Sequence, residues 1–173
     1  PNSSAAPILV SVYQDLLNIY YNELNAQTHL KKYVALLGYT ENEDGTKRLN
    51  ADALNFVLEY QLKNNFEGAE QLLTDIARYV AYLDNGGISG LGAFAANYAA
   101  ISFDYAVNIA RVMSSGLIAD GKNILAGETT FDFLVGSENS DTIRGYGGDD
   151  ILIGGAPEQE RSVVLLFHVF PVH

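Results

Sequence analysis

A nine-residue repeat between residues 118 and 155 constrains the fold of this chain more than any other feature. Written in nines, the stretch reads IADGKNILA, GETTFDFLV, GSENSDTIR and GYGGDDILI, and Gly154-Gly155 follow. The sixth position holds Asn123, Asp132, Asp141 and Asp150, the eighth holds Leu125, Leu134, Ile143 and Leu152, and the first holds glycine in every copy after the first. Ordinary loop glycines with solvated aspartates would not keep this phase, so the period predicts stacked, equivalent units.

Each unit divides into a turn and a strand. Glycine allows the first six residues to turn tightly with inward-pointing carbonyls, and the last three residues form a short strand whose apolar member fills the interior. Successive turns then alternate between the two edges of a flattened roll, so copies eighteen residues apart stack on one edge. Asp132 and Asp150 are therefore expected on one edge, and Asn123 and Asp141 on the other.

Stacked carboxylates and carbonyls favour a hard cation as ligand. Calcium takes six to eight oxygens at about 2.3–2.6 Å, which two such turns can offer. The formal charge of −11 and the pI near 4.5 disfavour nucleic acid, whose phosphates need clustered basic residues. The absence of cysteine excludes a disulfide framework and a thiolate zinc site.

The repeat resembles the RTX, or haemolysin-type, calcium-binding nonapeptide G-G-x-G-x-D-x-U-x, where U is a large apolar residue. GYGGDDILI departs from it only at Tyr146, and GSENSDTIR has Asn139 at the fourth-position glycine. GETTFDFLV keeps the first glycine, the aspartate and the apolar residue. The resemblance implies calcium as the cofactor and a short parallel β-roll. It also implies export by type I secretion and folding outside the cell, which makes this a secreted protein.

Candidate metal ligands follow from the two edges. Asp132 and Asp150 are expected to hold one ion, with help from carbonyls in the turns at 127–129 and 145–147. Asp141, which faces only Asn123, is expected to hold a second ion more weakly, because an amide brings no charge. The full set of candidate ligands is Asn123, Gly127, Thr129, Asp132, Gly136, Glu138, Asp141, Gly145, Gly147 and Asp150.

The residues before 116 predict helices, since apolar side chains recur at steps of three or four. We expect one long helix, or two broken near Asn25, over residues 7–37, and further helices over 51–64, 67–83 and 91–113. Asn85 and Gly86 are expected to end the third in left-handed conformations. Strands are expected to be confined to the repeats, with a strand in the tail as an open alternative. The first stripe expected to face a core is Tyr13, Leu17, Tyr20, Leu24, Leu30, Val34 and Leu37.

Three further features of the sequence bear on its function: an EF-hand-like loop, a candidate membrane helix and the lack of a catalytic motif. TENEDGTKRLNA places Gly45 like the glycine of an EF-hand loop, but Ala51 stands where the bidentate glutamate belongs, so a hairpin-like connection is expected. The segment 91–113 is expected to be a buried helix, and membrane insertion remains an alternative. No recognised catalytic motif is found, so no enzymatic activity is expected.

The chain is thus expected to hold a helical module at 1–116, calcium-binding repeats at 117–155 and an apolar tail at 156–173. The tail is interpreted as a capping strand, a remnant of a secretion signal or a foreign end. Without a cover, the open end of the roll would invite self-association. The expected function is a non-catalytic, calcium-folded part of a larger secreted protein. The alternative is that the helices form a membrane-active or effector segment with a calcium-binding tail.

Overall fold

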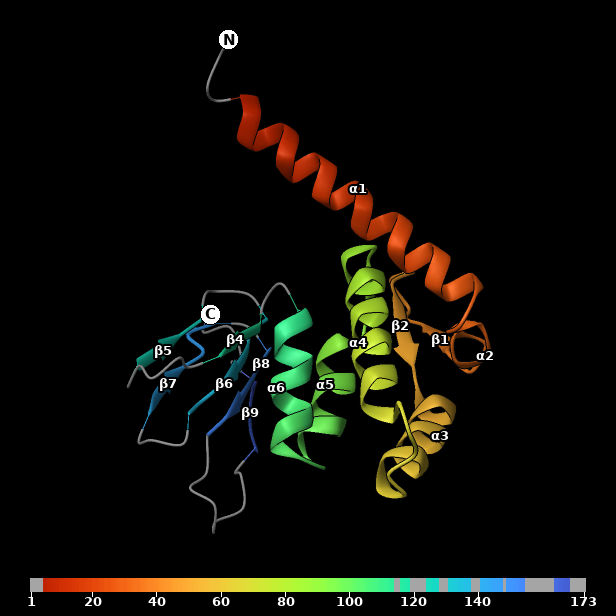
Figure 1. Ribbon diagram of the computed structural model, residues 1–173. Helices are drawn as coiled ribbons and strands as arrows, with labels where there is room; N and C mark the ends of the chain where they lie inside the picture. The colour runs from red at the N-terminus through yellow and green to blue at the C-terminus, as the bar shows by residue number, and fades with distance from the viewer. Residues whose placement is uncertain are drawn as a thin grey trace.

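The computed structural model describes residues 5–113, 116–118, 124–127, 131–137, 141–147, 149–154 and 164–168. Within these residues, six helices come first, interrupted by three short strands, and six strands follow (Figure 1). The helices are α1 (Ala5–Gln27), α2 (Lys31–Val34), α3 (Asp52–Lys63), α4 (Ala69–Asn85), α5 (Leu91–Ala99) and α6 (Phe103–Val112). The strands are β1 (Gly38–Glu41), β2 (Lys47–Asn50), β3 (Ile88–Ser89), β4 (Gly116–Ile118), β5 (Ile124–Ala126), β6 (Phe133–Val135), β7 (Thr142–Arg144), β8 (Asp149–Ile153) and β9 (Val164–His168).

The first helical stretch is broken into α1 and α2. The Asn25 carbonyl accepts hydrogen bonds from the N–H groups of Thr28 (3.2 Å) and Leu30 (2.9 Å), which turns the chain just after α1. The two-helix alternative is therefore the observed one. Leu30 is fully buried, but the α1 part of the expected core stripe is exposed. That part of the prediction is wrong, because α1 projects away from the body along most of its length (Figure 1).

Helices α3 and α4 form as expected, with one difference at the end of α4. The Asn50 side chain accepts a hydrogen bond from the Asp52 N–H (3.0 Å) as α3 begins, and Leu54 and Leu58 are fully buried. The left-handed residue after α4 is Gly87, with φ of +89°, whereas Gly86 keeps φ of −80°. The predicted Asn85–Gly86 stop is thus displaced by one or two residues, because Asn85 still belongs to the helix.

The expected fourth helix is two helices, α5 and α6. The chain is extended at Ser102, with φ of −155° and ψ of 140°, and α6 begins at the next residue. Serine in a helix interior competes with the helix through its own hydrogen bonds, which favours a boundary here. The break lets each helix bury a separate apolar face, which includes Phe94 and Tyr98 on α5 and Ile109 on α6.

A small sheet lies inside the helical region, so strands are not confined to the repeats and the tail. β1 and β2 pair antiparallel, and β3 adds to β2 in parallel, with Lys47 opposite Ile88. Helical periodicity failed to predict this sheet because its strands are short and mostly exposed. Gly90 is held close to this sheet with φ of +135°, where an added Cβ would lie 2.8 Å from the Leu49 Cβ.

The repeat strands form two parallel sheets. β6 pairs with β8 through Phe133 and Ile151, and β5 pairs with β7 through Ile124 and Thr142; both partners are eighteen residues apart. β4 joins the first sheet next to β6, which gives the order β4-β6-β8. Leu134 and Leu152 form a small core of their own, with Ile143 of β7 packed against it. The predicted eighteen-residue stacking and the inward eighth position agree with this pairing.

The other face of the β4-β6-β8 sheet is covered by α5 and α6 (Figure 1). Phe133, Val135, Ile151 and Ile153 are 0–2% exposed and belong to the same apolar core as the buried residues of α3 to α6. Tyr98 lies in this core and donates a hydrogen bond from its hydroxyl to the Asn55 side chain (2.7 Å). Burial raises the pKa of Tyr98 well above its usual value. Helices and repeats therefore share one hydrophobic core.

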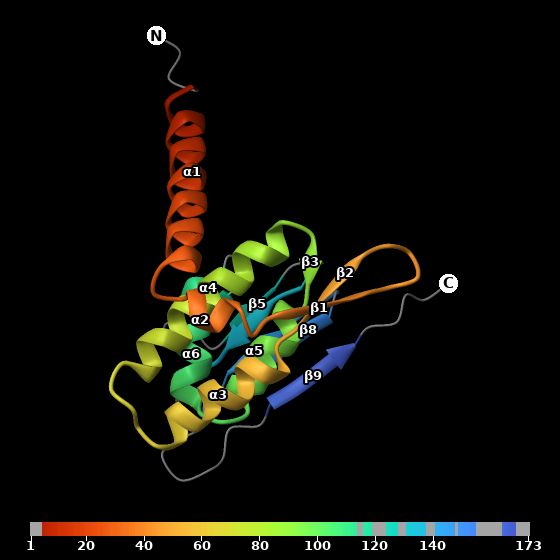
Figure 2. The same cartoon turned by 90° about the vertical axis from the view of Figure 1, so that its right-hand side faces the viewer.

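The tail closes one edge of this sheet. β9 pairs antiparallel with β8, from Asp149 opposite His168 to Ile153 opposite Val164, and continues the order to β4-β6-β8-β9 (Figure 2). The capping-strand interpretation of the tail is the one that this pairing supports. The last repeat strand thus has a partner on the side where a further repeat would have stacked.

Deleting residues 156–173 is expected to increase self-association of the chain, because it leaves the backbone groups of β8 unpaired along an open edge. Sedimentation velocity should then show larger species than the intact chain forms at the same concentration. A truncated chain that sediments like the intact one would mean that β9 protects nothing.

Candidate calcium site

Asp132 and Asp150 lie together where β6 and β8 begin: Asp132 directly precedes β6, and Asp150 is the second residue of β8. They are 4% and 2% exposed, although aspartate is rarely buried to this degree. The Asp132 N–H donates a hydrogen bond to the Asp150 Oδ1 (3.1 Å), and the Ile151 N–H donates one to the Asp132 carbonyl (3.0 Å). The structure thus brings together the two residues that the eighteen-residue spacing placed on one edge.

Each of these aspartates folds back over the first glycine of its own repeat. A Cβ added to Gly127 would collide with the Asp132 carboxylate, and one added to Gly145 would collide with that of Asp150. Glycine at the first position therefore makes room for the carboxylate of the sixth position. The Gly127 N–H donates to the Arg144 carbonyl (2.8 Å), which ties this turn to a neighbouring copy.

Asp141 occupies the corresponding place on the other edge. Its Oδ2 accepts hydrogen bonds from the backbone N–H of Ser137 (2.6 Å) and from the Ser137 hydroxyl (2.9 Å). Its Oδ1 is buried and has no hydrogen-bond partner among the described residues. A carboxylate oxygen left in this state is suited to a cation. Sequence reasoning did not foresee Ser137, whose position in the repeat varies between copies.

The remaining candidate ligands are only partly placed. Gly136 and Gly145 are buried and Gly147 is half-buried, all in the turns of their repeats. The Gly136 N–H donates to the Ile153 carbonyl (2.7 Å), which extends the pairing of β6 with β8. Asn123, Thr129 and Glu138 lie outside the described residues. Among the residues that are described, no group of three metal-ligating side chains converges, so carbonyls would have to complete any coordination shell.

These observations fit calcium. The donors available in the turns are carboxylate and carbonyl oxygens, which calcium prefers, and there is no sulfur in them. The glycine positions leave room for the inward carboxylates, and one carboxylate oxygen of Asp141 has no hydrogen-bond partner within the described part of the chain.

Comparison with known families decides what the repeats are. Residues 126–156 match the family model of the RTX calcium-binding nonapeptide repeat, which comprises four copies. This segment is an RTX calcium-binding repeat. No curated protein and no solved structure matches the chain. RTX repeats of this kind indicate a calcium-binding module typical of proteins exported by type I secretion.

The RTX segment departs from its consensus at Tyr146, where the consensus has glycine. Tyr146 has φ of +66°, in the left-handed region, and its side chain is 61% exposed. The turn therefore keeps the conformation that glycine would adopt, at the cost of backbone strain of about 1–2 kcal/mol. The exposed ring gains little packing in return.

Tyr146→Gly is expected to stabilise the calcium-loaded protein by about 0.5–1 kcal/mol, because relief of the left-handed strain outweighs the entropy that glycine loses on folding. Urea unfolding followed by tyrosine-independent far-UV circular dichroism measures this. Gly145→Ala is the matched control in the neighbouring position and should destabilise, since its Cβ collides with Asp150. Loss of stability in Tyr146→Gly would show that the ring makes a contribution of its own.

The loop at 42–46 is a hairpin turn and not an EF-hand. The Asp44 Oδ1 accepts hydrogen bonds from the Thr46 hydroxyl (2.6 Å) and the Thr46 N–H (2.9 Å), and Gly45 has φ of +80°. These bonds lower the pKa of Asp44, with the hydroxyl contributing most. The carboxylate that an EF-hand would use thus closes the turn between β1 and β2, as the hairpin reading predicts.

The membrane alternative for residues 91–113 gains no support from the helices. The segment forms two helices with buried faces, as described above. Within the described part of the chain, no helix has both the length and the apolarity needed to span a bilayer.

Proposed function

We propose that this chain is a non-catalytic module of a larger secreted protein, and that its repeats fold into a short parallel β-roll when they bind calcium. The observation that carries the proposal is the buried pair Asp132 and Asp150, eighteen residues apart in an RTX segment. Two carboxylates on stacked turns repel each other and are costly to bury. A divalent cation between the turns removes both penalties.

The same energetics explain how export and folding would be separated. At low calcium, the charge on the sixth-position aspartates opposes the stacking of the turns, and each turn alone buries little apolar surface. At high calcium, Asp132 and Asp150 would hold one ion and Asp141 a second. The chain would then remain unfolded where calcium is scarce and fold outside the cell, as the resemblance to type I-secreted proteins implies.

The shared core extends this effect to the helices. α5 and α6 pack on Phe133, Val135, Ile151 and Ile153, which β6 and β8 hold in place. The sequence predicts the helices as a module of their own at residues 1–116, separate from the repeats. The packing supports a different expectation, in which calcium completes the surface on which two helices dock.

Calorimetric titration of the full chain with calcium tests this proposal, with magnesium as the control cation. Calcium should bind with a dissociation constant in the range of extracellular modules, about 10⁻⁴–10⁻³ M. It should stabilise the fold by about 1.4 kcal/mol at ten times that constant. Magnesium should bind more weakly, because it demands a smaller octahedral site. The absence of both binding heat and stabilisation at about 10⁻² M calcium would refute the proposal.

A further inference from the structure

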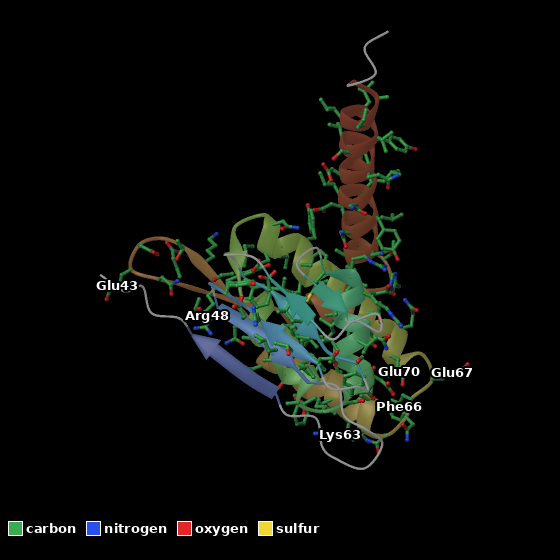
Figure 3. All side chains as sticks on the ribbon, turned by 90° about the vertical axis from the view of Figure 1, so that its left-hand side faces the viewer. Glu43, Arg48, Lys63, Phe66, Glu67 and Glu70 are labelled. Atoms are coloured by element: carbon green, nitrogen blue, oxygen red, sulfur yellow. The ribbon has the colours of Figure 1, made fainter. Side chains whose placement is uncertain are left out.

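Helix α1 carries a large apolar surface that no other described element covers. Its C-terminal part is tied to α4, where Glu23 accepts a hydrogen bond from the Tyr82 hydroxyl (2.7 Å) and Tyr21 accepts one from Arg78 (3.3 Å). One face of the helix, from Asp15 to Glu23, lines a hollow shared with the end of α4 and with β3, and the part before Asp15 stands clear of the body (Figure 3). The apolar side chains of α1 that are 43–68% exposed are Ile8, Leu9, Val10, Val12, Tyr13, Leu16, Leu17, Ile19, Tyr20, Tyr21 and Leu24.

These residues include a continuous seam with the spacing of a coiled coil. Val10, Tyr13, Leu17, Tyr20 and Leu24 follow one another at steps of three, four, three and four, which is the alternation of a and d positions in a heptad. A helix turns by about 100° per residue. The seam therefore lies roughly opposite Asn22, which is buried. The seam thus faces away from the body and is free to meet another helix.

The charges of α1 favour an apolar protein partner over a lipid surface. Between Ala5 and Gln27 there are two acidic residues, Asp15 and Glu23, and no lysine or arginine. Helices that lie on membranes typically present a basic polar face to anionic headgroups, and α1 has none. Both acidic residues of α1 lie off the five-residue seam, so a helix that packs on the seam needs no basic side chains to neutralise them.

The exposed apolar area of α1 is close to the area that each partner buries in a stable protein–protein interface. The seam and its flanks comprise eight side chains, namely Leu9, Val10, Tyr13, Leu16, Leu17, Tyr20, Tyr21 and Leu24. At these exposures they offer on the order of 700 Å² of apolar surface per chain, close to the roughly 800 Å² per partner of a standard interface. The helix has 23 residues and is about 35 Å long, enough for three heptads.

We propose that two copies of this chain associate through their α1 helices as an antiparallel two-stranded coiled coil. The orientation follows from charge, because the chain carries a net charge of −11 and only two of its acidic residues are on α1. A parallel pair would place two acidic bodies side by side. An antiparallel pair places them at opposite ends of the helices, where screening at physiological salt removes most of the repulsion.

Sedimentation equilibrium of the full chain tests the association. The wild type should be a dimer with and without calcium, since α1 has no part in the repeats. Leu17→Asp puts a charge in the centre of the seam and should raise the dimer dissociation constant at least a hundredfold. Val12→Asp makes the same change at an exposed off-seam position and should leave the dimer intact. A monomeric wild type, or a dimer that persists in Leu17→Asp, would overturn the proposal.

Disulfide cross-linking tests the orientation, because the chain has no cysteine of its own. In the antiparallel pairing Tyr13 faces Leu24 of the second copy. A mixture of Tyr13→Cys and Leu24→Cys should therefore form a mixed disulfide, whereas Tyr13→Cys alone should cross-link little. Efficient cross-linking of Tyr13→Cys to itself would overturn the antiparallel arrangement. Sedimentation of the wild type with phosphatidylcholine–phosphatidylglycerol vesicles, together with loss of the dimer, would instead assign α1 to a lipid surface.

Discussion

Asp150→Ala is expected to abolish the tighter calcium site while the weaker one survives. Asp150 belongs to the repeat closest to the consensus, is 2% exposed and accepts a hydrogen bond from the Asp132 N–H. Its removal leaves Asp132 without the second carboxylate of the pair. Calorimetric titration should then show one weak binding event in place of two, and the calcium-induced rise in unfolding temperature should fall by more than half.

Two control variants make this result specific. Asp44→Ala removes a carboxylate that closes the β1–β2 turn, so it should leave the calcium heats unchanged. Asp141→Ala removes the carboxylate whose Oδ1 has no hydrogen-bond partner among the residues that the structure describes, so it should eliminate the weaker event alone. Identical calcium heats for the wild type and Asp150→Ala would contradict the assignment of the tighter site.

Removing calcium is expected to loosen α5 and α6 as well as the repeats. These two helices bury their apolar faces against β6 and β8, whereas α3 lies farther from the sheet (Figure 1). Hydrogen exchange read by mass spectrometry should show the largest gain in exchange at residues 131–153 when a chelator is added. Residues 91–112 should follow, and residues 52–63 should change least. Unchanged exchange across 91–112 would show that the helices fold independently of the repeats.

A matched pair of substitutions separates the two faces of the repeats. Ile153→Ala empties a fully buried position of the shared core and should cost about 2–5 kcal/mol in saturating calcium. Thr142→Ala lies on an exposed position of β7 and should change the stability by about 0.5 kcal/mol or less. Both variants should bind calcium at saturation, because neither residue is a candidate ligand.

The sequence predicted the repeats well because their signals are local. The phase of the glycines and aspartates gave the stacking of Asp132 and Asp150 and the inward position of Leu134 and Leu152. The phase did not predict which repeat residues face the helices, although the seventh and ninth positions of the repeat carry that information. The seventh and ninth positions are apolar in the copies of β6 and β8, namely Phe133, Val135, Ile151 and Ile153, and polar in the copy of β7, namely Thr142 and Arg144. Those two positions are variable in the consensus, so they were passed over.

The helical region was predicted less well, for reasons of tertiary structure. Spacing identifies the apolar face of a helix but not what the face contacts, so the stripe through Tyr13 and Leu17 was placed in a core that does not reach it. The boundary at Ser102 divides a continuous apolar pattern, and periodicity continues across it. The β1-β2-β3 sheet is held by a turn at Asp44 and by Gly90, both of which depend on contacts that spacing does not encode.

Successive repeat strands alternate between two sheets, β5 and β7 in one and β6 and β8 in the other, and this gives the repeat array a parity. Inserting or deleting a single nonapeptide after β7 would move β8 to the opposite sheet, turn Ile151 and Ile153 toward solvent, and separate Asp150 from Asp132. Inserting or deleting two would restore both the docking face and the carboxylate pair. The smallest change of length that this architecture tolerates is therefore eighteen residues, and lineages of such chains should grow and shrink in pairs of repeats.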